Sequence, residues 1–242
     1  MGMGTRVVVV LGVALLGIGW PRAASGADGA VASRPASRPA AKIVVDTSDA
    51  PEMAEYGRKV QALSEEWYPK LIELLPSDGF TAPDTVTITF RKDYKGVAEA
   101  SGNRIKCAVK WFTDHPEDLG AVVHELVHVV QQYRRGNRPG WLVEGIADYL
   151  RFFHYEPVKA RPRPNPARAK HTDSYRTTGA FLDWAQRTYD KDLVVKLNTA
   201  CREARYDEAL WKEYTGKTLD ELGQAWLESL RKPAAAPAGA AR

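Results

Sequence analysis

The chain has 242 residues, of which 44% are hydrophobic and 26% are charged, and its formal net charge is +4. This length allows one domain with a substantial core, and the composition excludes a chain that is disordered throughout. A nucleic-acid-binding protein needs a clustered basic face, which so small a net charge does not indicate, so we expect no nucleic-acid partner.

The N-terminus, residues 1–27, is predicted to be a secretory signal peptide. A short basic start, "MGMGTR", precedes the apolar run "VVVVLGVALLGIGW" and then small residues, with Ala24 and Ala27 as the two candidate cleavage points. The run is shorter than the roughly 20 residues that span a bilayer. An uncleaved N-terminal anchor is the alternative. We therefore expect an exported protein, extracellular or periplasmic, without stable membrane association after cleavage.

Low-complexity segments flank the one predicted domain. Residues 28–41 form an Ala/Ser/Arg/Pro linker, in which proline favours extended and solvated backbone. Residues 232–242 form an Ala/Pro tail that we predict to be disordered. The domain itself is predicted to occupy residues 42–231.

The domain begins with strand and helix patterns. "KIVVDT", from residue 42, favours a first strand, and residues 51–76 place apolar side chains three and four apart, as in a helix. Pro69 lies within this helix and predicts a kink or a break there. Alternation of apolar and polar residues predicts further strands at 84–90 and 102–112.

The rest of the domain is predicted to be helical. The helices are expected at about 121–136, 141–155, 175–189, 191–204, 206–215 and 218–230. Gly136 is expected to end the first of these, and Pro139 and Gly140 to turn the chain so that the second packs antiparallel to it. Thr218 and Glu221 form a capping-box pattern. Strands followed by helices predict an α+β fold with a small antiparallel or mixed sheet and a mainly helical half.

The stretch "AVVHELVHVVQQ" contains the pattern H-E-x-x-H. His124 and His128 are four residues apart, so on a helix they lie one turn above the other and can bind one metal ion. Glu125 points to the side of that pair, where it can reach a metal-bound water. This is the arrangement of zinc metallopeptidases. The alternative is a solvated polar stripe that Gln131 and Arg135 continue.

A peptidase site also needs a third protein ligand and an open position for water. An extended pattern with Gly at 131 and His at 134 is excluded, because the chain has Gln131 and Arg134. "WLVEGIADYL" offers Glu144, which can complete a His/His/Glu set, and Asp148, which can accept the second ring N–H of a ligand histidine. An exposed acidic helix edge is the alternative role for this pair. The alternative third ligands are His154, His171 and Asp148.

Five segments of the sequence resemble the basic secretory proteins, a family described in plants, with bacterial relatives, and classed with the zinc peptidases. These segments are "YKGVAEASGNRIKCAVKWF", "VVHELVHVVQQY", "WLVEGIADYLR", "SYRTTGAFLDWAQRTYDKDLVVKLN" and "YTGKTLDELGQAW", and they cover most of residues 84–227. The resemblance implies a zincin-like (gluzincin) fold, a Zn²⁺ cofactor bound by His124, His128 and Glu144, and Glu125 as the catalytic base. The linker and the tail are not part of the family pattern.

These features predict a secreted zinc metallopeptidase with a peptide or protein substrate. Zinc lowers the pKa of a bound water to about 7, and Glu125 takes a proton from that water as general base. Tyr175 is the candidate stabiliser of the oxyanion, with Tyr149, His154 and His171 as alternatives. The strand "IKCAVKWF" is expected to be an edge strand that binds an extended peptide by strand addition.

Alternatives remain open at several points. One alternative function is that of a secreted binding protein on a peptidase scaffold without catalysis. Another is that of a zinc hydrolase acting on a cell-wall peptide or a deacylation substrate. Cys107 and Cys201 either pair in an oxidising compartment or stay as buried thiols. The Pro/Arg-rich loop 151–171 is either a lid or a spacer. The sequence carries no signal for an oligomeric state.

Overall fold

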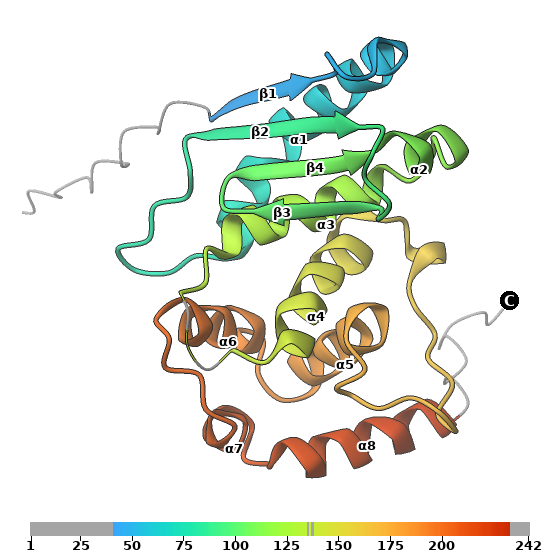
Figure 1. Cartoon of the computed structure of the whole chain (residues 1–242). Helices are drawn as coiled ribbons and strands as arrows, with labels where there is room; N and C mark the ends of the chain where they lie inside the picture. The colour runs from blue at the N-terminus through green and yellow to red at the C-terminus, as the bar shows by residue number, and fades with distance from the viewer. Residues whose placement is uncertain (1–40, 135, 137, 233–242) are drawn as a thin grey trace, which may run out of the picture. The chain divides into compact units, whose positions relative to one another are not determined.

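The computed structural model describes residues 41–134, 136 and 138–232 (Figure 1). The chain divides into two units, residues 1–38 and 39–242, and all described residues belong to the second unit. The predicted signal peptide lies outside the described residues, as do the linker and the tail except for residues 41 and 232. Within the described part, no helix is long and apolar enough to cross a membrane.

The fold is α+β, with a mixed four-stranded sheet and a mainly helical remainder, as predicted. The strands lie in the order β1-β2-β4-β3, where β1 and β2 pair in parallel, β2 and β4 pair in parallel, and β3 runs antiparallel to β4. Their bounds are Lys42–Asp46 for β1, Thr85–Arg91 for β2, Ala98–Ser101 for β3 and Arg104–Ala108 for β4.

One face of the sheet packs on helices α1 (Ala54–Leu74) and α3 (Leu119–Gln131), which Figure 1 shows behind the strands. Strand β2 explains why, because its side chains alternate between buried Val86, Ile88 and Phe90 and half-exposed threonines. Successive side chains of a strand point to opposite faces, so the apolar set meets the helices and the threonines face outward.

The third predicted strand is wrong in its second half. Strand β4 ends at Ala108, and the following residues form helix α2 (Val109–Asp114), in which Val109 and Phe112 are buried three residues apart. The strand is also not at the edge, because β4 lies between β2 and β3. The edge strand next to β4 is β3, which joins β4 through Gly102 with a φ of 60°.

Two predicted helix features can be compared with the structure. Helix α1 is not broken at Pro69, since the hydrogen bond that proline removes would reach the carbonyl of exposed Glu65, where water can replace it, and the predicted kink there stays a prediction. Helix α3 ends at Gln131 rather than near Gly136. Gln132 adopts a left-handed φ of 41°, and its side-chain amide donates to the carbonyl oxygen of Val129 at 2.9 Å.

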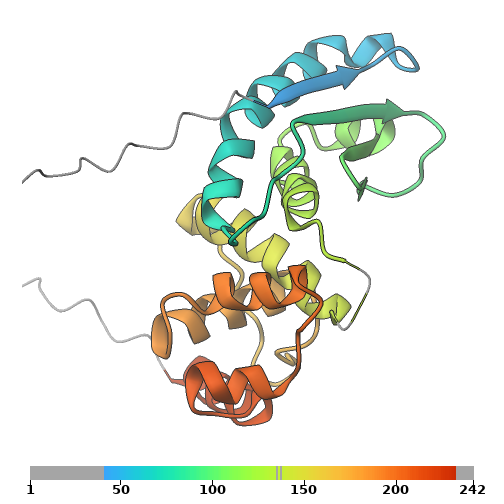
Figure 2. The ribbon, with the colours of Figure 1, turned by 90° about the vertical axis from the view of Figure 1, so that its left-hand side faces the viewer.

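The remaining helices form the second half of the domain, which Figure 2 shows below the sheet and helix α1. Thr218 caps helix α8 in the predicted capping box with Glu221. The two cysteines, Cys107 and Cys201, are free and buried, so they form no disulfide. The helical bounds are Gly140–Leu150 for α4, Tyr175–Thr188 for α5, Leu193–Arg202 for α6, Ala209–Thr215 for α7 and Leu219–Arg231 for α8, with a π-helical turn η2 at Arg151–Tyr155 and a short 3-10 turn η3 at Val158–Ala160.

A buried arginine joins the two halves of the domain. The Arg202 guanidinium, at the end of α6, donates to the carbonyl oxygens of Val130 and Gln131 at 3.0 and 3.2 Å. It also donates to the carbonyl oxygen of Leu75 at 3.1 Å. The last carbonyls of a helix have no partner within the helix, so one side chain satisfies groups at the ends of both α3 and α1. Burial lowers the pKa of Arg202 to about 10, where it still carries its charge at neutral pH.

Helices α4 and α5 approach each other closely because two glycines lie between them. A Cβ added at Gly145 would lie 2.2 Å from Cγ2 of Thr178, and one added at Gly179 would lie 3.0 Å from the backbone nitrogen of Tyr149. Neither position has room for a side chain. The start of α5 is therefore held close to the face of α4 that carries Asp148.

We expect Gly179→Ala to lower the free energy of unfolding by about 1–3 kcal/mol, because its methyl group would meet the backbone of α4, which cannot turn aside as a side chain can. Gly140→Ala, at the start of α4, is the matched control, since a Cβ there meets no atom within 4 Å. Denaturant-induced unfolding of both variants measures the difference. Equal stability of the two variants would contradict the close contact.

Candidate metal centre

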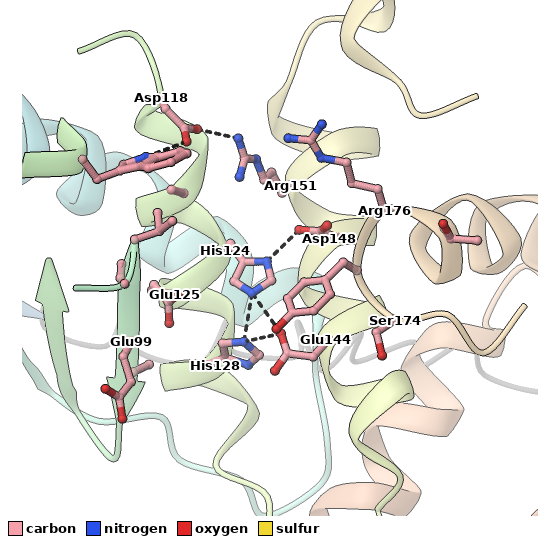
Figure 3. A pocket seen from close by; sticks show the side chains of 18 of the residues that line it. Glu99, Asp118, His124, Glu125, His128, Glu144, Asp148, Arg151, Ser174 and Arg176 are labelled. Carbon is pink, nitrogen blue, oxygen red and sulfur yellow. Dashed lines mark hydrogen bonds and ion pairs between the residues drawn. The ribbon is translucent and has the colours of Figure 1, made fainter. Parts of the chain in front are cut away.

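A cavity of about 790 Å³ lies between edge strand β3 and helices α3, α4 and α5 (Figure 3). His124, Glu125 and His128 line it from α3. Glu144 and Asp148 line it from α4. The first residues of α5, with Tyr175 among them, form a further wall. The cavity thus collects the first-choice site residues of the sequence analysis: His124, Glu125, His128, Glu144, Asp148 and Tyr175.

The H-E-x-x-H residues do not belong to a solvated stripe, which was the alternative interpretation of the sequence. Eleven of the thirteen residues of α3 are buried. His124 and Glu125 are each 8% exposed, and Gln131, which would continue the stripe in that alternative, is 2% exposed. Buried polar side chains need polar partners or an ion, so the contacts of these residues decide what the site can do.

Three side chains meet at one point of the cavity. The Nε2 atoms of His124 and His128 are 3.1 Å apart, and Oε2 of Glu144 lies 3.2 Å from the first and 3.3 Å from the second. The three atoms therefore form a triangle with nearly equal sides (Figure 3). A group of two imidazoles and one carboxylate in this arrangement could hold a metal ion.

Asp148 determines which nitrogen of His124 is free. Its Oδ1 lies 2.7 Å from Nδ1 of His124, and because an ionised carboxylate only accepts hydrogen bonds, Nδ1 carries a proton. In the neutral imidazole, Nε2 then has a lone pair that points into the triangle. This contact is the one expected for Asp148 from its spacing to Glu144. An exposed acidic edge is excluded for Asp148, which is 4% exposed.

Gln131 fixes the tautomer of His128, as Asp148 fixes that of His124. The sequence analysis did not identify Gln131 as part of the site. Its Nε2 donates to the carbonyl oxygen of Val143 at 2.9 Å, so its Oε1 is the atom that faces Nδ1 of His128 at 2.8 Å. An amide oxygen only accepts, so Nδ1 of His128 carries the proton and Nε2 is free. The available signal was that Gln131 follows His128 by three residues, on the same side of the helix.

The side chains of the triangle carry the charges of an ion pair. Burial alone would lower the pKa of His124, but its hydrogen bonds to Asp148 and Glu144 outweigh burial and raise the pKa to about 9. Burial alone would raise the pKa of Glu144, but its hydrogen bonds with His124 and His128 lower the pKa to about 2. The site is therefore built to hold a positive charge next to an ionised Glu144.

Glu125 lies on the strand side of the two histidines (Figure 3). Its carboxylate accepts a hydrogen bond from the backbone N–H of Ala100 in β3. Burial is the largest influence on this carboxyl and raises its pKa, although the nearby histidines act against it. A carboxylate that stays outside the triangle yet opens to the same cavity is free to exchange a proton with a bound molecule.

Tyr175 is the one of the four candidate oxyanion stabilisers that lines the cavity. Its ring stacks on that of His124, with 6.0 Å between centroids and 20° between planes. The charge of Glu144, and then burial, raise the pKa of its hydroxyl, which therefore stays protonated and able to donate. The alternatives lie elsewhere: Tyr149 bonds to Gln186, His154 packs on Tyr149, and His171 packs on Trp141 and Phe181.

Comparison with known proteins shows which family the chain belongs to. A family model described as a peptidase of plants and bacteria matches residues 44–226. The chain belongs to the basic secretory protein (BSP) family. The expected resemblance is thus confirmed, and the family name supports a peptidase. Neither a curated protein nor a solved structure matches the chain, so the zincin-like part of the fold prediction stays a prediction.

The BSP cavity also contains charged residues that the sequence analysis did not assign. Asp118 accepts hydrogen bonds from the Trp111 indole at 3.1 Å and from the Arg151 guanidinium at 2.5 Å. Arg176, in the first turn of α5, lines the same side of the cavity. No local motif marks these residues, because they come together only through the packing of α3, η2 and α5.

Gln131→Leu is expected to weaken the binding of a metal ion at the triangle by about 10–100-fold, because His128 would lose the acceptor that orients its ring. Gln61→Leu, which changes a half-buried glutamine on α1 that donates to Glu65, is the matched control. Competition with a chromophoric chelator measures the affinity of each variant for Zn²⁺. An affinity of the Gln131 variant equal to that of the control would remove Gln131 from the site.

Proposed function

We propose that this BSP-family protein is a zinc-dependent metallopeptidase, with His124, His128 and Glu144 as the metal ligands and Glu125 as the general base. The observation that carries the proposal is the triangle of donor atoms with sides of 3.1, 3.2 and 3.3 Å. Two atoms that each lie 2.0–2.1 Å from a tetrahedral zinc ion are about 3.3–3.4 Å apart, so the triangle fits one face of a zinc coordination sphere.

The donor set also favours zinc by its chemistry. Two neutral imidazoles and one carboxylate are the ligands of the His₂Glu zinc sites of hydrolytic enzymes, which leave a fourth position open. Asp148 and Gln131 hold each imidazole in the tautomer that such a site needs. When bound, zinc would polarise a substrate carbonyl and lower the pKa of water to about 7.

Glu125 is the proposed carrier of the proton. Its carboxylate takes a proton from the attacking water and returns it to the nitrogen of the leaving amine. Burial keeps it out of bulk solvent, and the hydrogen bond from Ala100 orients it. Tyr175 is proposed to donate a hydrogen bond from its hydroxyl to the developing oxyanion, on the basis of its stacking on His124.

The substrate is proposed to be an extended peptide that pairs with β3. This strand is the edge strand on the cavity side of the sheet, and its Ala98, Glu99 and Ala100 line the cavity. Adding a strand to an exposed edge gives main-chain hydrogen bonds without regard to sequence. The role that the sequence analysis gave to "IKCAVKWF" therefore passes to its neighbour β3.

The metal content of the purified chain tests the proposal first. We expect close to one zinc ion per chain after dialysis against metal-free buffer, and loss of that zinc in Glu144→Ala, which removes a ligand. Glu73→Ala, an exposed glutamate on α1, is the matched control and should keep its zinc. A wild-type chain that retains no zinc, even when zinc is supplied, would overturn the proposal.

Glu125→Gln then separates catalysis from binding. This variant should bind zinc like the wild type and lose peptide hydrolysis by at least about 10²-fold, the usual contribution of a general base. Cleavage of a denatured protein substrate, followed by mass spectrometry, measures the activity. A variant that binds zinc and cleaves at the wild-type rate would exclude Glu125 as the base. A zinc-loaded wild type that cleaves nothing would favour a binding protein.

Export is the second part of the proposal and is supported by the signal-peptide pattern of residues 1–27. The full chain, expressed in a bacterial host with a secretion apparatus, should be recovered outside the cytoplasm. Its new N-terminus should be Ser25 or Asp28, the residues that follow the two candidate cleavage points. An intact N-terminus in the cytoplasmic fraction would contradict export.

A further inference from the structure

One end of the cavity carries a positive charge without a partner. Arg176 is exposed and lines the cavity from the first turn of α5. Its guanidinium carbon lies 4.9 Å from the centre of the Phe152 ring, and it forms no ion pair with any residue in the described ranges. Figure 3 shows it next to Arg151, on the Asp148 side of His124.

The neighbouring Arg151 is different, because carboxylates already neutralise it. Its guanidinium pairs with Asp118 at 2.5 Å and lies 3.5 Å from Glu156, and it contacts the same Phe152 ring at 4.7 Å. Two guanidinium groups therefore rest on one aromatic ring, which holds both in place. Of the two, only Arg176 has no carboxylate partner among the described residues, so it is the guanidinium at this end of the cavity that is free to bind an acidic group.

The position of Arg176 is unfavourable for the local structure. A cation in the first turn of a helix opposes the helix dipole, and this turn contains no acidic residue. The two preceding residues, Ser174 and Tyr175, have left-handed φ angles of 65° and 46°, which residues other than glycine seldom adopt. Departures of this kind from local preference are expected where function requires them.

The positive charge continues outside the cavity. Residues 157–172 contain no Asp or Glu, and Asp173 and Ser174 connect them to the start of α5. Five basic residues of this segment are exposed, and none of them forms an ion pair with a described residue: Lys159, Arg161, Arg163, Arg168 and Lys170. At the other side of the histidines, Figure 3 shows an acidic residue, Glu99, which pairs with Lys106. The charged side chains at the two ends therefore differ in their pairing, since Glu99 has a cationic partner whereas Arg176 has no anionic partner among the described residues.

We propose that Arg176 binds a carboxylate of the substrate. The enzyme is then selective for peptides that carry a carboxylate near the scissile bond, on one side of that bond. This inference rests on the proposed peptidase function and names its substrate class. A guanidinium can donate two parallel N–H groups to one carboxylate, which gives orientation as well as attraction. The carboxylate is either an Asp or Glu side chain or the C-terminus of the peptide.

Matched quenched-fluorescent peptides test the selectivity of the zinc-loaded enzyme. One set exchanges Glu for Gln at each position on both sides of the scissile bond, and a second set exchanges a free C-terminus for an amide. We expect kcat/KM to favour the carboxylate member by about tenfold at one side, as a charge-assisted hydrogen bond gives. The set that responds identifies the source of the carboxylate.

Variants of two arginines on α5 test whether Arg176 causes the preference for carboxylate peptides. Arg176→Gln should bring the carboxylate-to-neutral ratio of kcat/KM close to one, and Arg176→Glu should reverse it in favour of Lys peptides. Arg187→Gln, which changes an exposed arginine that pairs with Asp183, should keep the wild-type ratio. Fluorescence anisotropy of the same labelled peptides bound to Glu125→Gln, with and without Arg176→Gln, should give the same order of Kd values without turnover.

The possible failures are distinct. A wild type that cleaves peptides with a carboxylate-to-neutral ratio near one would overturn the role of Arg176 and leave the peptidase intact. An unchanged ratio in Arg176→Gln would do the same. A zinc-loaded wild type that cleaves no peptide would overturn the peptidase proposal and this inference with it.

Discussion

The burial of helix α3 is the constraint on which the rest of the structure depends. A helix with eleven of thirteen residues buried has little water to satisfy its polar groups, yet it carries two histidines, a glutamate and a glutamine. Each of these must find a partner in the protein, as must the carbonyls at its C-terminal end. The partners come from different elements: Asp148 from α4, the backbone of Ala100 from β3, and Arg202 from α6.

The contacts that make this burial tolerable are also the contacts that shape the site. Asp148 and Gln131 satisfy the outer nitrogens of the histidines, and in doing so they direct both inner nitrogens to one point beside Glu144. Gly145 and Gly179 bring α5 against α4, so that Tyr175 and Arg176 border the same cavity. The same side chains therefore support both the stability of the fold and the candidate chemistry, so a substitution that changes one will also change the other.

The parts of the site that lie within single helices could be predicted from the sequence, because four-residue spacing fixes which side chains share a face. This holds for His124 with His128 and for Glu144 with Asp148. Other features depended on tertiary packing. Gln131 resembles a solvent-facing residue until Val143 is placed beside it, and β3 has the weak strand formers Ala, Glu and Ser. Over this short run, Val109 and Trp111 have the spacing of a strand whereas Val109 and Phe112 have the spacing of a helix, and tertiary packing decided for the helix.

The two unpaired cysteines allow the folding of each half of the domain to be followed separately. Cys107 lies in β4 within the sheet and Cys201 lies in α6 within the helical half, and burial raises the pKa of both thiols. A buried, protonated thiol reacts with an alkylating reagent only when its surroundings open. The natural chain thus contains one reporter thiol in each half of the domain. The labelling rates of the two thiols would show whether the sheet and the helices open together or one before the other.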